Sequence, residues 1–236
     1  MVTQQGRPNI SPAGMPELRF LAMPARDVTL HDTWYSSGLC GTGSCDMELK
    51  DLFVPDEYSF GFINEPPRIS RPLYSVPPFG LLTMGVAAVT LGIARRAIDE
   101  LRALALKKLL MPSRQPLATR AGVQTAVAEA EAQVRAARAM LFESVNSTYA
   151  AANRGEISTR NRAELRLACT HAVRASARAV DLMYEAGGGT SVFRSHPLQR
   201  CFRDIHTVTQ HVMVSAATME TIGSVLLGLE TDTTLL

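Results

Sequence analysis

The feature that most constrains the fold is a long apolar repeat with the period of an α-helix, which begins at Leu81. In GLLTMGVAAVTLGIARRAIDELRALALKKLL, apolar residues recur at spacings of three and four, for example at Val86, Val89 and Ile93. Residues with that spacing share one face of a helix. The stretch therefore predicts a long amphipathic helix that buries one side in a core.

Three further segments are helical in character, and helix breakers separate them. MPSRQP and NRGEIST interrupt the pattern, with Gly155 as a predicted stop and Ser158 or Thr159 as a predicted N-cap. The glycines at 187–189 end the next segment, and Pro197 suits the first turn of a following helix. The predicted helices cover residues 117–153, 160–185 and 213–229. Four long helices with short connections predict an antiparallel four-helix bundle.

Residues 1–75 have a different pattern, with short alternating stretches, glycines and prolines. DMELKDLFVP alternates apolar and charged residues, which predicts a half-buried strand that ends at a proline. NEPPRISRPLYSVPPFG is rich in proline and forbids a continuous helix. The expected domains are a partial β-domain with this linker at 1–75 and a helical bundle at 76–236. The predicted fold class is therefore mainly α.

Composition indicates a globular protein and gives no reason to expect a nucleic-acid or membrane partner. The chain has 236 residues, 46% hydrophobic and 19% charged, with a formal net charge of +2. Arg95 and Arg96 end the most apolar stretch, so no uninterrupted run approaches the roughly 18 residues of a spanning helix. The N-terminal residues lack the apolar region of a signal peptide. We therefore expect a cytoplasmic protein.

Four cysteines are present, at positions 40, 45, 169 and 201. Cys40 and Cys45 are separated by four intervening residues, whereas zinc ligands usually form tighter pairs beside a second pair or histidines. His31 is the only histidine near them in the sequence. We expect no metal site and interpret the cysteines as reduced structural thiols.

Residues 184–211, YEAGGGTSVFRSHPLQRCFRDIHTVTQH, combine glycines with arginines and histidines. The glycines either only stop a helix or also let the backbone approach a phosphate or an adenine. Arg203 and Asp204 are interpreted as a structural ion pair that holds the loop. His196 and His206 are interpreted as surface or hydrogen-bonded residues.

Two motifs together resemble the acyl-CoA dehydrogenase superfamily. DTWYSSGLCGTGSCDMELKDLFVP resembles a segment of its β-domain, and residues 184–211 resemble the loop and helix between its last two bundle helices. The resemblance covers residues 18–230 and implies the later part of the β-domain followed by the bundle, without the N-terminal helical domain. It also implies a flavin, FAD or FMN, between the two parts, and a homo-oligomer, either a dimer or a tetramer.

The resemblance implies two activities. Dehydrogenases of the superfamily need a glutamate base, and residues 186–204 contain no glutamate. Monooxygenases of the type 2 branch use flavin reduced by a separate reductase, form a C4a-peroxyflavin and place a histidine late in the bundle, where His211 matches. Imidazole changes charge near neutral pH, so it can take a phenolic proton or hold the peroxide. We expect such a monooxygenase acting on a small aromatic molecule. The alternatives are an acyl-CoA dehydrogenase acting on an acyl thioester and a non-catalytic helical fragment that retains the oligomer interface.

The same resemblance suggests flavin contacts, each with a plainer alternative. Lys108 and Arg114 either meet flavin phosphates or are solvated cations near a helix end. Trp34 and the GTGS turn either line the flavin edge or only shape a β-turn. The candidate catalytic residue is His211, and the candidate cofactor-binding residues are Trp34, Thr42, Ser44, Lys108, Arg114, Gly188, Gly189, Thr190 and Ser191.

Overall fold

The computed structural model describes residues 3–4, 7–10, 17–61 and 65–236, and the chain divides into two compact units. Unit 1 comprises Met1–Tyr35 and Cys40–Ser70, and unit 2 comprises Ser36–Leu39 and Arg71–Leu236. The short segment Ser36–Leu39 thus leaves unit 1 and belongs to unit 2. The residues on which the signal-peptide prediction depends lie partly outside the described ranges.

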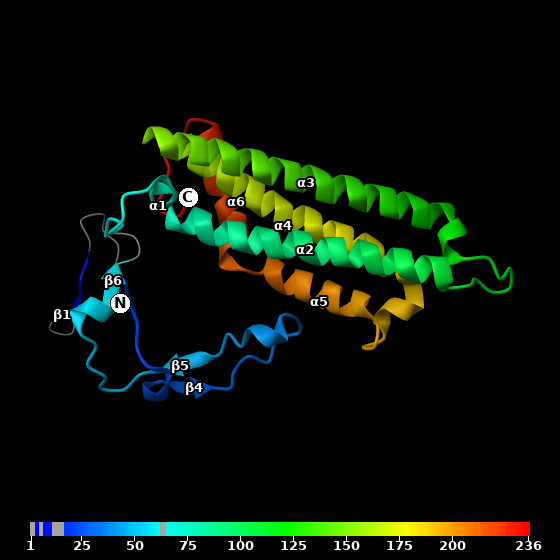
Figure 1. Ribbon diagram of the computed structural model, residues 1–236, viewed down its shortest axis with the longest axis horizontal. Coiled ribbons are helices and arrows are strands. Elements are labelled where there is room, and N and C mark those ends of the chain that lie inside the picture. The colour runs from blue at the N-terminus through cyan, green and yellow to red at the C-terminus, as the bar shows by residue number, and fades with distance from the viewer. Residues whose placement is uncertain (1–2, 5–6, 11–16, 62–64) are drawn as a thin grey trace. The chain divides into compact units, whose positions relative to one another are not determined.

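Three long helices form the core of unit 2, namely α2 (Pro78–Lys107), α3 (Ala121–Arg154) and α4 (Thr159–Gly187). They run side by side, and α4 packs against both α2 and α3 (Figure 1). A short helix, α1 (Pro72–Ser75), precedes them. Alanines on α4, such as Ala168, Ala172 and Ala179, are fully buried. Their small side chains allow the neighbouring helices to approach closely.

Two short helices complete the bundle in succession. Helix α5 (Pro197–Thr209) packs against α2 and α4, and α6 (Ala216–Leu226) packs against α4. The 3-10 turn η6 (Val212–Val214) lies between them. The prediction of one long helix at 213–229 is therefore wrong. Ser215, with φ −66° and ψ 170°, interrupts the helical backbone, and Gly228 turns the chain with φ 74° after α6 ends.

Local capping chemistry sets the ends of the long helices. The Asn161 N–H donates to Ser158 Oγ at 3.1 Å, and the Ser158 N–H donates to Asn161 Oδ1 at 3.2 Å, which forms a capping box at the start of α4. Gly155 ends α3 with a left-handed φ of 73°. Pro197 is the first residue of α5. The predictions of these caps are confirmed.

The first half of α2 departs from the predicted buried face at one position, Val89. Val89 is 54% exposed, whereas Thr83, Ala87 and Thr90 are fully buried. These smaller residues meet the bundle because close packing against α4 favours small side chains over large ones. Val86 and Ile93 of the predicted face still pack against buried clusters, so the prediction fails at Val89.

Among the described residues, α2 is a helix that is long and apolar enough to cross a membrane, judged by length and composition alone. Its most apolar window of 18 residues has a mean hydropathy of 1.5, so the expectation that no stretch approaches this length is wrong by that measure. Within the bundle, 39% of the same window is buried. A core helix meets the same criterion, so length and composition do not distinguish the two.

The described strands all lie in unit 1 and form three antiparallel pairs. The strand predicted in DMELKDLFVP covers only Asp46–Glu48, and Met47 is 72% exposed. The prediction of a half-buried strand is therefore wrong. Within the described part of unit 1, this strand belongs to a two-stranded ribbon, which buries little surface by itself. The pairs are β1 (Thr3–Gln4) with β2 (Arg7–Pro8), β3 (Arg19–Leu21) with β6 (Ser59–Gly61), and β4 (Thr29–His31) with β5 (Asp46–Glu48).

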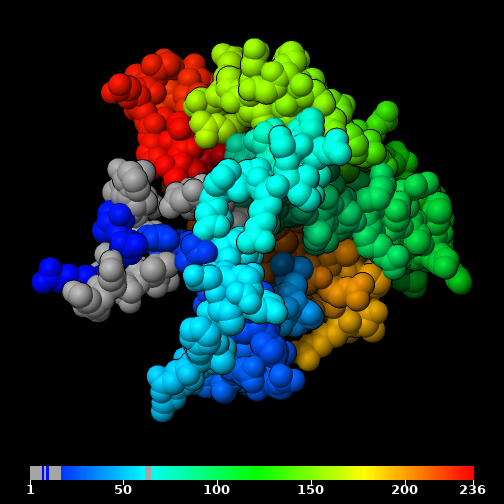
Figure 2. Space-filling view, turned by 60° about the vertical axis from the view of Figure 1, so that its left-hand side comes forward, coloured from blue at the N-terminus to red at the C-terminus, as the bar shows by residue number. Residues whose placement is uncertain are grey.

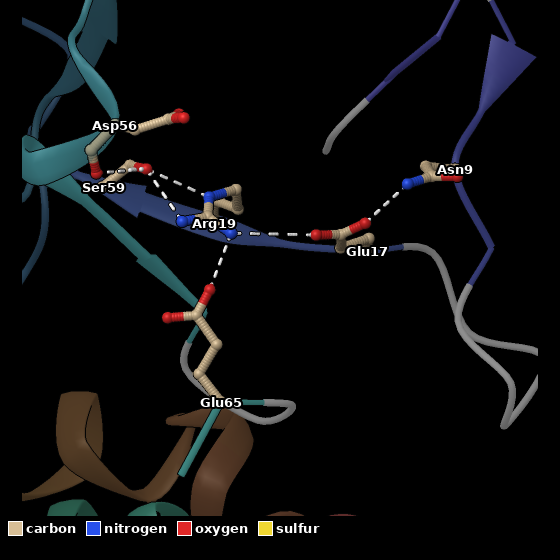
Figure 3. A network of polar contacts seen from close by, with 6 residues as sticks. All are labelled: Asn9, Glu17, Arg19, Asp56, Ser59 and Glu65. Carbon is tan, nitrogen blue, oxygen red and sulfur yellow. Dashed lines mark hydrogen bonds and ion pairs between the residues drawn. The ribbon is translucent and has the colours of Figure 1, made fainter. Parts of the chain in front are cut away.

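A polar network around Arg19 ties together the β3–β6 pair of unit 1 (Figure 3). The Arg19 guanidinium donates to Glu65 Oε1 at 2.6 Å and, through Nε and NH2, to Ser59 Oγ at 3.1 and 2.9 Å. A hydrogen bond from the Gly61 backbone, with the charge of Arg19, holds the pKa of Glu65 below its ordinary value. This network supplies unit 1 with specific contacts that its short strands do not.

The C-terminal residues pack where α3 ends and α4 begins, as the red segment in Figure 2 shows. Leu236 is 2% exposed and packs with Ala163 of α4 and Ile222 of α6. The end of the chain thus forms part of a small second core in unit 2.

Candidate functional site

His211 lies in the exposed turn between α5 and α6. Its backbone N–H donates to Val208 O at 2.9 Å, and its carbonyl accepts the Val214 N–H at 3.0 Å. Its Nδ1 accepts the Met213 N–H at 3.2 Å and so caps η6. A neutral imidazole that accepts at Nδ1 carries its proton on Nε2. As it is held here, His211 therefore presents a hydrogen-bond donor at Nε2.

In the glycine turn at the end of α4, the local structure requires glycine at two positions. A Cβ on Gly187 would lie 2.1 Å from Ser191 Oγ and 3.0 Å from Leu198 Cδ1. Gly188 has a φ of 58°, which glycine adopts without steric cost. A Cβ on Gly189, in contrast, would meet nothing within 4 Å. Local structure therefore explains Gly187 and Gly188 but not Gly189.

Lys108 lies beside this glycine turn. Its Nζ donates to the carbonyl oxygen of Gly187 at 2.9 Å, which joins the end of α2 to the end of α4. An ammonium there complements the C-terminal dipole of α4. Two predicted cofactor residues, Lys108 and Gly188, are thus brought together, and a Cβ on Gly188 would lie 3.8 Å from Lys108 Nζ.

Ser191 is removed from the candidate cofactor contacts, because its side chain is directed into the core. It is fully buried, and its Oγ fills the space that a Cβ on Gly187 would need. Thr190, by comparison, is half-buried. The turn therefore offers a ligand the backbone around Gly189 and the side chains of Thr190 and Lys108.

The structure does not bring His211 to the glycine turn. The two lie at opposite ends of α5, whose 13 residues span about 20 Å. Arg114 is exposed in the loop after α2, where its φ is 57°. Trp34, Thr42 and Ser44 belong to unit 1, and the hydroxyl oxygens of Thr42 and Ser44 lie 3.2 Å apart. Within unit 2, His211 is thus separate from the glycine turn and Lys108.

Sequence reasoning missed the docking of Ser36–Leu39 on α5. The Leu39 N–H donates to Asp204 Oδ1 at 2.7 Å, and Arg203 NH1 donates to the carbonyl oxygen of Ser37. A Cβ on Gly38 would lie 2.2 Å from the carbonyl oxygen of Arg203. Arg203 and Asp204 do hold a loop, as predicted, but through its backbone and not as an ion pair with each other. Their adjacency in RD was the only sequence signal for this contact.

The other two histidines near the site have structural partners. His206 Nε2 lies 2.7 Å from Asp181 Oδ1, and its ring packs 4.5 Å from that of Phe202. His196 Nδ1 accepts the Leu198 N–H at 3.3 Å and caps α5. The interpretation of both as hydrogen-bonded residues is confirmed.

Arg166 is a buried cation that the sequence did not single out. It is 2% exposed, and its NH1 donates to Thr83 Oγ1 and, at 3.4 Å, to the carbonyl oxygen of Phe79. Burial lowers the pKa of its guanidinium and raises the pKa of the nearby Cys169 thiol to about 12. Arg166 thus links α4 to the start of α2 within the core.

An apolar groove of about 530 Å³ lies between α2 and α3. Met84, Leu91 and Leu141 line it, and the Arg138 guanidinium lies 4.4 Å from the centre of the Phe142 ring at its edge. None of the predicted site residues lines this groove. Among the described residues, no group of three or more His, Cys, Asp or Glu side chains lies close enough together to hold a metal ion.

Comparison with solved structures defines the class of protein. The chain superposes on 3-HSA hydroxylase from Rhodococcus sp. RHA1 with a TM-score of 0.82 and 25% identity, covering 97% of this chain and 61% of that one. The architecture is therefore the acyl-CoA dehydrogenase-like fold, and the predicted fold class is confirmed. The family model of the acyl-CoA dehydrogenase C-terminal domain matches residues 84–216. The chain belongs to this family.

Two relatives of known activity are similar along most of the chain. Indole-3-acetate monooxygenase from Acinetobacter baumannii is 31% identical over 218 residues, which cover 92% of this chain and 55% of that protein. The oxygenase component of FADH(2)-dependent resorcinol hydroxylase from Rhizobium sp. is 29% identical over 236 residues, with 92% and 58% covered. The chain thus spans little more than half the length of either relative.

Proposed function

We propose that this chain forms the β-domain segment and bundle of a flavin-dependent monooxygenase, as the oxygenase component that accepts flavin from a separate reductase. Both relatives described above are monooxygenases or hydroxylases, and one is named as an oxygenase component. Within the structure, the observation that carries the proposal is His211, an exposed imidazole held by the Met213 N–H.

Bound reduced flavin, FAD or FMN, would supply the electrons that activate dioxygen. The polar groups of a flavin suit residues that have open space or a charge beside them. Gly189 has open space where a side chain would be, and Lys108 places an ammonium at the same turn. Thr42 and Ser44 offer exposed hydroxyls in unit 1. We assign Lys108, Gly189 and Thr190 to the phosphates or adenine, and Trp34, Thr42 and Ser44 to the flavin edge.

We propose that His211 donates a hydrogen bond to the activated oxygen. On this proposal it does not act as the base that removes a phenolic proton. Because Nδ1 accepts the Met213 N–H, the neutral ring carries a proton on Nε2 and has no lone pair there. A ring that took a proton at Nε2 would first have to move its existing proton to Nδ1, where the Met213 N–H already points. The geometry therefore favours donation over abstraction.

We also propose a small aromatic molecule as the substrate and a homo-oligomer, a dimer or a tetramer, as the assembly. The aromatic substrate class follows from the indole and resorcinol in the names of the two relatives. A cytoplasmic location stays a prediction from the sequence. Size-exclusion chromatography with light scattering tests the assembly, and a mass equal to one chain would contradict it.

The experiment that tests the function uses the purified chain with FAD or FMN and with indole-3-acetate or resorcinol as aromatic probes. We expect bound flavin, and hydroxylated product when anaerobically reduced flavin meets dioxygen. Anaerobic bleaching of bound flavin by an acyl-CoA would instead indicate a dehydrogenase. A chain that gains no protein-bound flavin absorbance would indicate the non-catalytic alternative.

A further inference from the structure

We propose that Asp204 and Leu39 are positioning residues for His211. The Asp204 carboxylate holds the Leu39 backbone, and the Leu39 side chain packs against the apolar cluster that contains Val208 and Val214 on either side of the imidazole. The importance of His211 rests on the proposed function, whereas the positioning itself rests on contacts inside unit 2.

Three contacts hold the segment Ser36–Leu39 on α5. The Leu39 N–H donates to Asp204 Oδ1 at 2.7 Å, and the Ser37 carbonyl accepts a hydrogen bond from Arg203. Gly38 is buried and lies so close to the Arg203 carbonyl oxygen that a Cβ would be only 2.2 Å from it. The segment is therefore fixed to the middle of the helix that leads to His211.

The Leu39 side chain packs against an apolar cluster whose members flank the His211 turn. It contacts a cluster of the buried residues Val173, Val208 and Val214. Val208 is three residues before His211 and Val214 is three residues after it, and both form backbone hydrogen bonds with His211. A leucine that packs against this cluster can therefore stabilise the two valines that flank the turn.

The backbone conformation of Leu39 indicates that the surrounding contacts hold this residue in place. Its φ of 51° lies in the left-handed region, which is unfavourable for a residue with a branched side chain. Such a conformation persists only where surrounding contacts determine it. The hydrogen bond from this same residue's N–H to Asp204 is the most direct of those contacts. Loss of the carboxylate should therefore release Leu39 and loosen the turn.

The test compares full-length Asp204→Ala, Asp204→Asn and Leu39→Asn with the unchanged chain. Asparagine at 204 keeps an oxygen that accepts the Leu39 N–H. Asparagine at 39 tolerates a positive φ, so it removes the apolar contact without adding backbone strain. Leu106→Ala, at a residue 71% exposed on α2, is the matched control for loss of a leucine side chain.

The readouts are the ring nitrogen signals of His211 and hydrogen exchange of the Met213 amide, which donates to His211 Nδ1. We expect Asp204→Ala and Leu39→Asn to speed Met213 exchange at least tenfold and shift the ring signals, while Asp204→Asn and Leu106→Ala do not. The Val134 amide in α3 reports global unfolding. Unchanged Met213 exchange, or an equal increase at Val134, would overturn the proposal. An unchanged chain that binds no flavin would contradict the proposed function without altering this outcome.

Discussion

The Leu39 N–H donates to Asp204 Oδ1 at 2.7 Å, although the two residues are 165 positions apart in the chain. This hydrogen bond holds a segment that leaves unit 1 against the helix that leads to His211. The sequence neighbours of that segment include Trp34 and Thr42, which we assign to the flavin edge. The segment Ser36–Leu39 is therefore adjacent in the sequence to the proposed flavin contacts. The same segment is hydrogen-bonded to the helix that leads to the proposed catalytic turn.

The close approach of Gly38 to α5 predicts a sharp difference between two glycines. Gly38→Ala should lower the free energy of unfolding by about 1–3 kcal/mol, because its Cβ would overlap the rigid Arg203 carbonyl. Gly41→Ala is the control, since a Cβ there meets nothing within 4 Å. Urea unfolding followed by circular dichroism measures both. Equal stabilities would show that the Ser36–Leu39 segment is not docked as described.

Alanine substitutions at two positions of the glycine turn should have different effects, one on stability and the other on flavin binding. Gly187→Ala should destabilise the fold by about 1–3 kcal/mol, because the added methyl overlaps Ser191 Oγ and touches Leu198. Gly189→Ala should leave stability nearly unchanged and weaken flavin binding, if a ligand approaches that backbone. Thermal unfolding and flavin titration of both variants make the comparison. Full flavin affinity in Gly189→Ala would leave the turn as a helix stop only.

The ion pair between Arg95 and Glu131 predicts a modest acid sensitivity. Arg95 donates to both Glu131 oxygens, at 2.9 and 3.0 Å, and this hydrogen bonding lowers the pKa of Glu131. A lowered pKa stabilises the fold above the ordinary glutamate value of about 4.3, and that stability is lost as the pH falls through the folded value. Both side chains are about one-third exposed, so the coupling should stay below about 1 kcal/mol.

A double-mutant cycle with Arg95→Met and Glu131→Gln measures this coupling at neutral and acidic pH. The more exposed pair Arg160 and Glu164 serves as the control and should couple less. A coupling that does not shrink toward acidic pH would contradict the assignment.

The cysteines should differ strongly in reactivity. Cys40 is exposed, whereas Cys169 is fully buried and burial raises its pKa to about 12. Cys40 should react with a thiol reagent in the native protein, and Cys169 only after unfolding. Above the ordinary thiol pKa of about 8.5, the unfolded state loses this proton and the folded state keeps it, so stability should fall as the pH rises. Peptide mapping after labelling identifies the sites, and rapid native labelling of Cys169 would contradict its burial.

Local signals in the sequence predicted much of the bundle, because caps and breakers act within a few residues. Ser158, Gly155 and Pro197 mark helix ends for reasons that the neighbouring residues supply. The burial of single positions on α2 was not predictable in the same way, since Val89 is exposed although Val86 and Ile93 of the same predicted face pack against buried clusters.

The sequence offered candidate site residues but not the contacts that hold them in place. His211 stays a candidate from the sequence, and its hydrogen bond from Met213 depends on the turn that follows α5. Glycines 187 and 189 look alike in the sequence, and the positions of Ser191 and Leu198 in the fold separate them. The contact between Leu39 and Asp204 joins distant segments without a pattern in either one.

The most direct test of the central claim compares His211→Ala with His211→Gln in the aerobic oxidation of reduced flavin with an aromatic probe. We expect both variants to bind flavin as the unchanged chain does. His211→Ala should release hydrogen peroxide in place of hydroxylated product, and His211→Gln should retain part of the product because its amide can still donate a hydrogen bond. Unchanged hydroxylation in His211→Ala would contradict the account.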